Sequence, residues 1–359
     1  MAAVASSTDY LLSLDADSDF YDSLDVQKHA VAIIGRYRTK NIRGYGFVRH
    51  RMASSANDGS KLWKHHAMLF YLREWSSKPF TVFLGLQIER TRSTADGYVS
   101  GLVAEVAASV DFLIIVVHTI LRLGASSANR CQVEPMCSWS GDLFNDKHRI
   151  PVRQATSILN SLKLRHNVQV PLLLSLSLGV LQYDVNRDHS NESPRLRGLN
   201  CSNAFLQPFT TVCNTKSTFK SGGQRESMLC HYQDDPVHGR WRTFMTSTDI
   251  MNQTHSVQHA LDPSVAAGVG WAVYDLELED TSGDCAAYWG GTKEHPQTFA
   301  YFRLKTAAKE ILALKETKTS DFNATGSTVE WSQPLPDAEV TIAQSREYDT
   351  NVTSKNSEY

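Results

Sequence analysis

The stretch from Gly268 to Cys285, GVGWAVYDLELEDTSGDC, decides the fold of this chain. It starts as a short apolar run, which predicts a strand at Gly268–Leu276, and continues into alternating acidic and apolar residues before a Gly and a Cys. Trp271 and Tyr274 are three residues apart, so in a strand their side chains point to opposite faces. We interpret Trp271 as a core residue.

Similar apolar runs recur upstream and alternate with stretches of helical pattern, as repeated βα units do. The other strands are predicted at Tyr10–Leu14, Tyr45–Val48, Thr81–Ile88, Asp111–His118 and Pro171–Leu181. The helices are predicted at Asp19–Tyr37, Gly59–Trp75, Thr94–Ser109, Arg153–Leu164, Ser256–Ala260 and Gln297–Leu314. This alternation predicts an α/β fold with a parallel sheet.

Two regions break this rhythm. The region from Asp184 to Phe244 is polar, rich in Asn, Ser and Gly, and holds three cysteines. We predict that it is a long loop, held by disulfides rather than by a core of its own. Residues 316–359 are polar with few large apolar side chains, and we predict a disordered tail there.

The Gly268–Cys285 stretch resembles the last barrel strand of the family 18 glycoside hydrolases, the chitinases. Tyr10–Leu24 resembles the third strand of that family, and the segments TVFLGLQIERT, VDFLIIVVHTI and VPLLLSLSLGVLQY resemble its strands five, six and seven. The resemblance implies a (β/α)8 TIM-barrel domain over residues 1–315 that lacks the first two βα units. With six strands, the barrel is either a fragment or open at an edge.

The resemblance also implies that the hydrolytic machinery is lost. Family 18 enzymes carry D-G-x-D-x-D-x-E on the fourth strand, and the final Glu protonates the leaving glycosidic oxygen. The corresponding stretch here runs from Arg43 to His50, keeps only Gly44, and has His50 at the catalytic Glu position. We expect His50 to be a polar residue at the barrel mouth and predict no catalytic residue. The sixth-strand pattern M-x-Y-D is replaced by Val116–Thr119.

A binding site is still predicted at the barrel mouth. Tyr274 aligns with the Trp that floors the family's sugar subsite, and a Tyr face can stack on a sugar ring with less area. The other predicted binding residues are His118, Asp275 and Tyr183. The acids Asp275, Glu277 and Glu279 alternate along the chain, and we interpret them as a structural run. The alternative is that Glu277 acts as a non-standard acid.

Several features predict a secreted protein, although the N-terminus has neither the basic nor the apolar part of a signal peptide. The six cysteines are even in number and form no metal-type C-x-x-C pair. Glycosylation is predicted at Asn200, Asn252, Asn323 and Asn351. We therefore expect an extracellular protein and expect the start of the precursor to be missing.

Composition excludes several other classes of partner. The formal charge of -2 does not indicate a polyanion partner, and the basic residues from Arg36 to Arg51 are interleaved with apolar ones as in a strand, so no nucleic acid is expected. The longest apolar runs are too short to span a membrane. Asp234 and Asp235, with His231 and His238, have loose ligand spacing, and we predict neither a metal nor a cofactor.

The family resemblance implies a disulfide between Cys213 and Cys285. Cys131 and Cys137 are close enough in sequence to close a short loop, which leaves Cys201 and Cys230.

Three hypotheses for function remain open. The first is a secreted, catalytically inactive chitinase-like protein that binds a chitin-type glycan or an extracellular protein at the barrel mouth. The second is a residual glycosidase that hydrolyses β-1,4 N-acetylglucosamine linkages. The third is a product without a stable fold.

Overall fold

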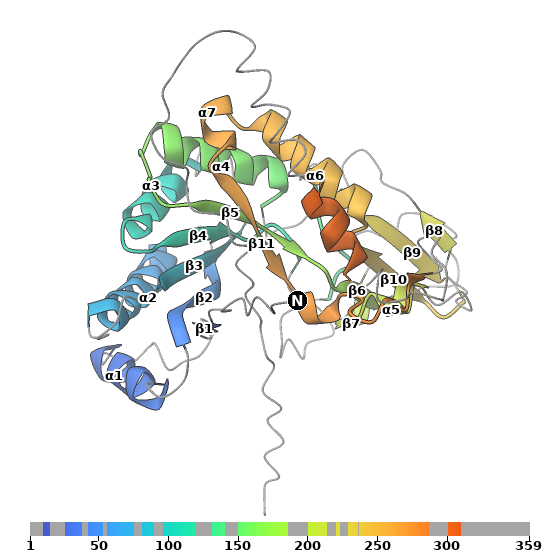
Figure 1. The fold of residues 1–359 in the computed structure, drawn as a ribbon, viewed down its shortest axis with the longest axis horizontal. Helices are drawn as coiled ribbons and strands as arrows, with labels where there is room; N and C mark the ends of the chain where they lie inside the picture. Colours follow the sequence, from blue (N-terminus) through green and yellow to red (C-terminus); the bar gives the residue numbers. More distant parts are fainter. Residues whose placement is uncertain are drawn as a thin grey trace, which may run out of the picture.

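The computed structural model contains two β-sheets, one parallel and one antiparallel (Figure 1). The residues that it describes are 10–14, 26–37, 42–52, 56–74, 81–89, 96–119, 131–140, 150–185, 200–213, 220–222, 229–235, 237–286 and 301–309. The predicted tail at 316–359 and the predicted glycosylation sites Asn323 and Asn351 lie outside these ranges.

The parallel sheet has one strand at each of the six predicted strand regions, in the predicted order along the chain. Its order is β1-β2-β3-β4-β5-β11, and all neighbours are parallel. The strands are β1 (Tyr10–Ser13), β2 (Ile42–Met52), β3 (Thr81–Ile88), β4 (Phe112–Ile115), β5 (Leu172–Ser177) and β11 (Val269–Tyr274). Within the described residues no pairing joins β1 to β11, so the sheet is open where a complete barrel would close.

Helices line the outer face of this sheet. Figure 1 shows α1 (Val26–Tyr37), α2 (Ala56–Glu74), α3 (Asp96–Ala107) and α4 (Val152–Leu164) following one another along the sheet, and consecutive helices are in contact. The helices α6 (Ser247–Ala260) and α7 (Pro263–Ala266) pack against α4, and a last helix covers 302–309. The main core lies between sheet and helices, because alternate strand residues such as Leu113, Ile115 and Val117 are buried there.

A β-bulge in β2 changes which way one predicted site residue points. Phe47 pairs with Leu84, but the next pairing recorded is His50 with Leu86, so two residues of β2 oppose Gly85 alone. Without the bulge, His50 would share the face of Val48 by the alternation of a strand. The extra residue puts His50 on the face of Phe47, which is the face that packs on α2.

The region predicted to be a long loop instead forms an antiparallel sheet, whose buried residues such as Tyr183 and Trp241 join the main core. Its order is β7-β6-β10-β9-β8. The strands are β6 (Val180–Val185), β7 (Cys201–Gln207), β8 (Lys220–Gly222), β9 (His231–Asp235) and β10 (Arg240–Phe244). The predicted strand Pro171–Leu181 is therefore two strands, which separate at Leu178 and Gly179 and enter different sheets.

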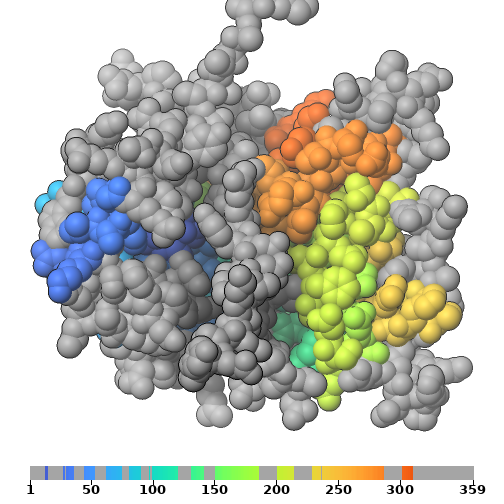
Figure 2. All heavy atoms as spheres, turned by 90° about the horizontal axis from the view of Figure 1, so that it is seen from below, coloured from blue at the N-terminus to red at the C-terminus, as the bar shows by residue number. Residues whose placement is uncertain are grey.

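Two disulfides fasten the antiparallel sheet to the rest of the chain. Cys213, at the end of α5 (Thr210–Cys213), is bonded to Cys285, as predicted. In Figure 2, yellow-green atoms adjoin orange atoms on the face shown, so parts of the chain that are far apart in sequence lie side by side there.

The second disulfide joins Cys131 to Cys201, so the predicted Cys131–Cys137 pairing is wrong. The backbone explains the difference, because the Cys201 N–H donates to the Cys131 carbonyl over 3.0 Å and brings these two residues side by side. Cys137 and Cys230 are buried thiols.

A buried ion pair connects helix 302–309 to both sheets. The Arg303 guanidinium bonds to Glu279, which follows the short 3-10 helix η4 (Leu276–Leu278). It also donates to the Met245 carbonyl after β10 over 2.5 Å and to the Leu178 carbonyl after β5 over 2.6 Å. Both side chains are almost fully buried. Glu279 therefore has a structural role, as the sequence predicted for the acidic run.

Candidate functional site

The inner face of the parallel sheet carries the candidate site, at the carboxyl ends of β4, β5 and β11. Alternation puts Ile114, Val116 and His118 on the inner face, opposite to the residues that pack on the helices. Two other strands add the polar residues Ser175 and Ser177 from β5, and Tyr274 and Asp275 from the end of β11. We call His118, Ser175, Ser177, Tyr274 and Asp275 the strand-end cluster. Of the four predicted binding residues, the structure brings together His118, Tyr274 and Asp275.

Tyr274 packs across the inner face of the sheet, from β11 to β2. Its hydroxyl donates to the Val48 carbonyl on β2 over 2.6 Å, so one side chain spans from the last strand to the second. The ring lies 4.6 Å from the His118 ring and packs with Ile114 and Val116, and the residue is 6% exposed. Burial raises the pKa of the phenol, so it stays a neutral donor. In this arrangement the ring is packed and does not offer an open face on which a sugar could stack.

His118 and Ser175 form a buried pair. The His118 Nδ1 lies 2.7 Å from the Ser175 Oγ, and the same Oγ accepts from the Val117 N–H over 2.8 Å. A Ser next to a His is the residue pair that nucleophilic catalysis uses. Here Ser175 has no exposed surface and His118 is 2% exposed, so an external substrate does not reach the hydroxyl. The pair holds the end of β4 against β5.

Asp275 supplies the carboxyl of the cluster. Its backbone is left-handed, with φ 56°, and its carboxylate accepts a hydrogen bond from the Ser177 hydroxyl. Ser177 Oγ in turn accepts from the Gly179 N–H over 3.2 Å. Burial raises the pKa of Asp275, the Ser177 hydrogen bond works against that rise, and the negative charge of Glu277 adds to it. A raised pKa is a property that carboxyl groups acting as general acids share.

Tyr183 lies away from this cluster, whereas Glu277 is two residues from Asp275. Tyr183 is on β6, is 2% exposed, and packs with its ring 5.9 Å from that of Trp241 in the antiparallel sheet. Glu277 is exposed on η4 after β11.

His50 is not a polar residue at the mouth, and this expectation is corrected. The β2 bulge buries it against α2, where its Nδ1 lies 2.6 Å from the Nδ1 of His65 and the residue is 2% exposed. A proton donor in that place faces the helix layer and not the interior of the sheet.

The sequence reasoning missed Ser175 and Ser177. The signal was present, because LLLSLS alternates Leu with Ser in the second half of an apolar strand. Period two puts both hydroxyls on one face and the leucines on the other. Two hydroxyls on a buried inner face need partners, and His118 and Asp275 provide them.

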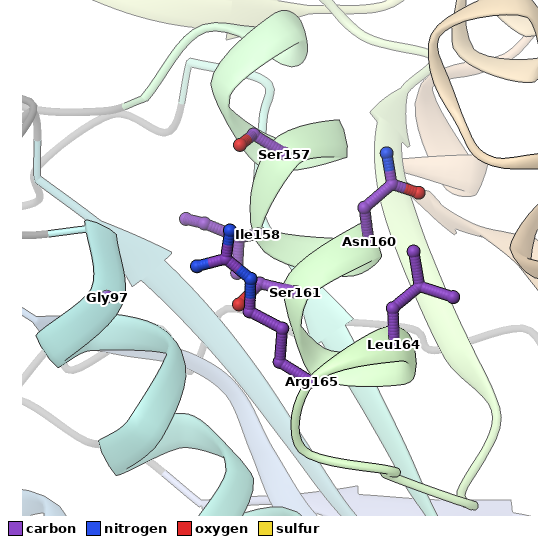
Figure 3. A pocket seen from close by; sticks show the side chains of 7 residues that line it. All are labelled: Gly97, Ser157, Ile158, Asn160, Ser161, Leu164 and Arg165. Carbon is purple, nitrogen blue, oxygen red and sulfur yellow. The ribbon is translucent and has the colours of Figure 1, made fainter.

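A cavity of about 220 Å³ lies elsewhere, between α3 and α4. Figure 3 shows its lining, which comes from Gly97, Ser157, Ile158, Asn160, Ser161, Leu164 and Arg165. The Asn160 amide is used structurally, since it donates to the Ala260 carbonyl and accepts from the Asp262 N–H. The cavity contains no residue of the strand-end cluster and no carboxyl group.

Further predicted features can be located on the described residues. Asn200 and Asn252 are both exposed, which glycosylation requires. No group of three or more His, Cys, Asp or Glu side chains in the described ranges is arranged to hold a metal ion. Among the described helices, none combines the length and the hydropathy that crossing a bilayer needs.

Comparison with known proteins gives matches among solved structures only. No family model and no curated protein matches the chain. A glycoside hydrolase family 18 N-acetylglucosaminidase from Paenibacillus barengoltzii matches with a TM-score of 0.47 and 13% identity, over 79% of this chain and 82% of the other. A family 18 chitinase from Cycas revoluta in complex with (GlcNAc)4 matches with a TM-score of 0.48 and 10% identity, over 75% and 76%. A chitinase from Rhizomucor miehei matches with a TM-score of 0.47 and 10% identity, over 73% and 77%.

The chain resembles the family 18 chitinases. All three matches have low sequence identity and a TM-score below 0.5. The alignment of His118 and Tyr274 with binding residues of family 18 enzymes is a prediction from the sequence. The structure gives the contacts that these two residues make in the strand-end cluster.

Proposed function

We propose that this chain is an extracellular, catalytically inactive protein with a chitinase-like fold. The observation that carries the proposal is the closure of the sheet interior by Tyr274, whose hydroxyl is bonded to the Val48 carbonyl and whose ring is packed on His118. A glycosidase needs an acid aimed at the bridging oxygen of a bound sugar. Here the inner face is filled, and His50 is turned toward α2.

The two disulfides support an extracellular location, because disulfides persist in oxidising compartments. The exposed sequon residues Asn200 and Asn252 are consistent with passage through a secretory route.

A ligand of this protein binds outside the filled interior, at the rim of the strand ends. The exposed Glu277 and the partly exposed Asp275 offer carboxylate oxygens there, which can accept hydrogen bonds from sugar hydroxyls or from backbone amides of a protein. We therefore keep a chitin-type glycan or an extracellular protein as the class of partner.

A fluorogenic chitobioside tests the proposal. The purified protein is expected to release no fluorophore above the rate without protein, at any pH between 4 and 8. Turnover that survives in Glu277→Gln and is lost in Asp275→Asn would overturn the proposal.

The second candidate function is a residual glycosidase, and one observation favours it. Asp275 lies at the carboxyl end of β11, and burial raises its pKa, so it holds a proton to higher pH than an exposed Asp does, as a general acid requires. The same two variants show which residue acts as the acid. If turnover is lost in Glu277→Gln and not in Asp275→Asn, the acid is Glu277.

A further inference from the structure

Cys137 and Cys230 meet in the interior, between the segment that follows β4 and the start of β9. The Sγ of Cys230 lies 3.3 Å from the Cys137 backbone nitrogen, which donates to it, and 3.2 Å from the Cys137 carbonyl oxygen. The two residues are 1% and 0% exposed. They are 93 positions apart in sequence, so the fold and not the local chain brings them together.

The surrounding contacts fix this meeting point. The Thr243 hydroxyl on β10 donates to the Cys230 Sγ over 3.3 Å and accepts from the Met136 N–H over 3.3 Å. Next in sequence, the His231 Nδ1 lies 2.6 Å from the Asp249 carboxylate on α6. These contacts hold the backbone of Cys137 against the side chain of Cys230.

We propose that Cys137 and Cys230 form a third disulfide, which locks β9 of the antiparallel sheet to the segment after β4. The chain already holds two disulfides, so the conditions under which it folds oxidise paired thiols. The inference does not depend on the proposed function.

The oxidation needs a disulfide-class oxidant, such as oxidised glutathione or an oxidised dithiol protein. The Cys230 thiolate attacks one sulfur of the oxidant, forms a mixed disulfide and expels the first thiolate. The Cys137 thiolate then attacks the Cys230 sulfur and expels the second. Two electrons pass to the oxidant, and the two protons of the Cys137 and Cys230 thiols go to the expelled thiolates or to water.

In the folded chain the surroundings of Cys230 favour its thiolate form. Burial alone would raise the pKa of this thiol, but hydrogen bonds from Cys137 and Thr243 outweigh burial and lower the pKa. Because both sulfurs are buried in the folded chain, the reaction takes place while the segment 131–140 is still docking.

The bridge would have a local consequence at the strand-end cluster. The Thr119 N–H donates to the Met136 carbonyl over 2.9 Å, and its hydroxyl donates to the Pro135 carbonyl over 2.8 Å. Thr119 follows His118 directly, so a bond at Cys137 anchors the loop that holds the end of β4.

The test is peptide mapping of the full chain secreted from a eukaryotic host. The protein is denatured with iodoacetamide and without reductant, then digested and analysed by mass spectrometry. We expect a linked peptide that contains Cys137 and Cys230, with neither residue alkylated. The proposal is overturned if both residues are alkylated while Cys131–Cys201 and Cys213–Cys285 are recovered as linked peptides, or if either residue is linked to a different cysteine.

Single variants provide the matched control. Cys137→Ser is expected to leave Cys230 as the one alkylated cysteine, and Cys230→Ser to leave Cys137, with the other two linked peptides reporting that each variant has folded. A Cys137→Ser protein in which Cys230 stays protected counts against the proposal. The double variant is expected to melt about 5 °C below the oxidised protein, because the lost bridge closes a long loop. An unchanged melting temperature in the double variant also counts against it.

Discussion

Asp275 holds its carboxyl in a partly buried place next to the Ser177 hydroxyl, and burial raises its pKa. The native state therefore binds this proton more tightly than the unfolded chain does. The stability that follows is present below the unfolded pKa of about 3.9 and is lost as the pH rises through the folded pKa. Because burial penalises the charge, the ionised carboxylate makes the folded chain less stable than a neutral side chain of the same shape would.

Asp275→Asn removes the charge and keeps the shape. Asn accepts the Ser177 hydrogen bond and tolerates the left-handed backbone at φ 56°. We expect the variant to melt above the wild type at pH 7 to 8, with the difference shrinking toward zero near pH 3. Calorimetric melts across this pH range give the comparison. Glu277→Gln is the control, since an exposed substitution of this kind changes the free energy of unfolding by less than about 0.5 kcal/mol. A lower melting temperature for Asp275→Asn at pH 7 would contradict this interpretation.

At the scale of the elements, the β2 bulge depends on close backbone contact with β3. Gly85 lies opposite the two bulge residues Val48 and Arg49, and a Cβ there would overlap the Val48 carbonyl. Because the obstacle is backbone on a neighbouring strand, no rotamer relieves it.

Gly85→Ala is expected to lower the free energy of unfolding by about 3 kcal/mol or more, since overpacking in a core commonly costs 1–3 kcal/mol and here the backbone must move. Gly101→Ala is the matched control on α3, where the added Cβ meets only the His166 ring at 3.9 Å. That change is expected to stabilise the protein by up to about 1 kcal/mol. Urea unfolding of both variants provides the measurement, and equal midpoints for the two would argue against the bulge as described.

Helix 302–309 is held by the buried pair of Arg303 and Glu279. Removing one partner leaves the other as a buried charge, which costs about 3–5 kcal/mol. Arg303→Met is expected to show this loss in urea unfolding, whereas Lys305→Met, on the exposed side of the same helix, is expected to show almost none. Adding Glu279→Leu to Arg303→Met should recover part of the loss, because no unpaired charge remains. If Arg303→Met unfolds at the same urea concentration as the wild type, the ion pair does not stabilise the helix.

At the scale of the whole molecule, the centre of the parallel sheet could be predicted because β3, β4 and β5 are nearly continuous apolar runs. Both faces of β3 and β5 are buried, so nearly every position in these strands requires an apolar or small residue. The antiparallel sheet could not be predicted in the same way. Along β7, Cys201 is buried but Ser202 and Asn203 are exposed, so the strand has the composition of a loop. The segment is a strand because it pairs with β6, and this pairing depends on the tertiary fold.

Part of the candidate site could be predicted from the positions of its residues at the ends of predicted strands. His118, Tyr274 and Asp275 come from strand ends, which meet at one edge of a parallel sheet whatever the details. The position of His50 depends on a bulge that the register with β3 creates, and Tyr183 depends on the second sheet. The pairing of Cys131 with Cys201 needed the bridge between Gln132 and Asn200, which no local pattern in the sequence indicates.

The central claim is that Tyr274 fills the interior of the open sheet and leaves no sugar subsite there. A crystal structure of the protein soaked with the tetrasaccharide of N-acetylglucosamine tests this directly. The account predicts that the Tyr274 hydroxyl remains on the Val48 carbonyl and that any bound sugar lies outside, at the rim near Glu277. A sugar ring stacked on Tyr274, with the contact to Val48 broken and the bridging oxygen next to Asp275, would contradict it.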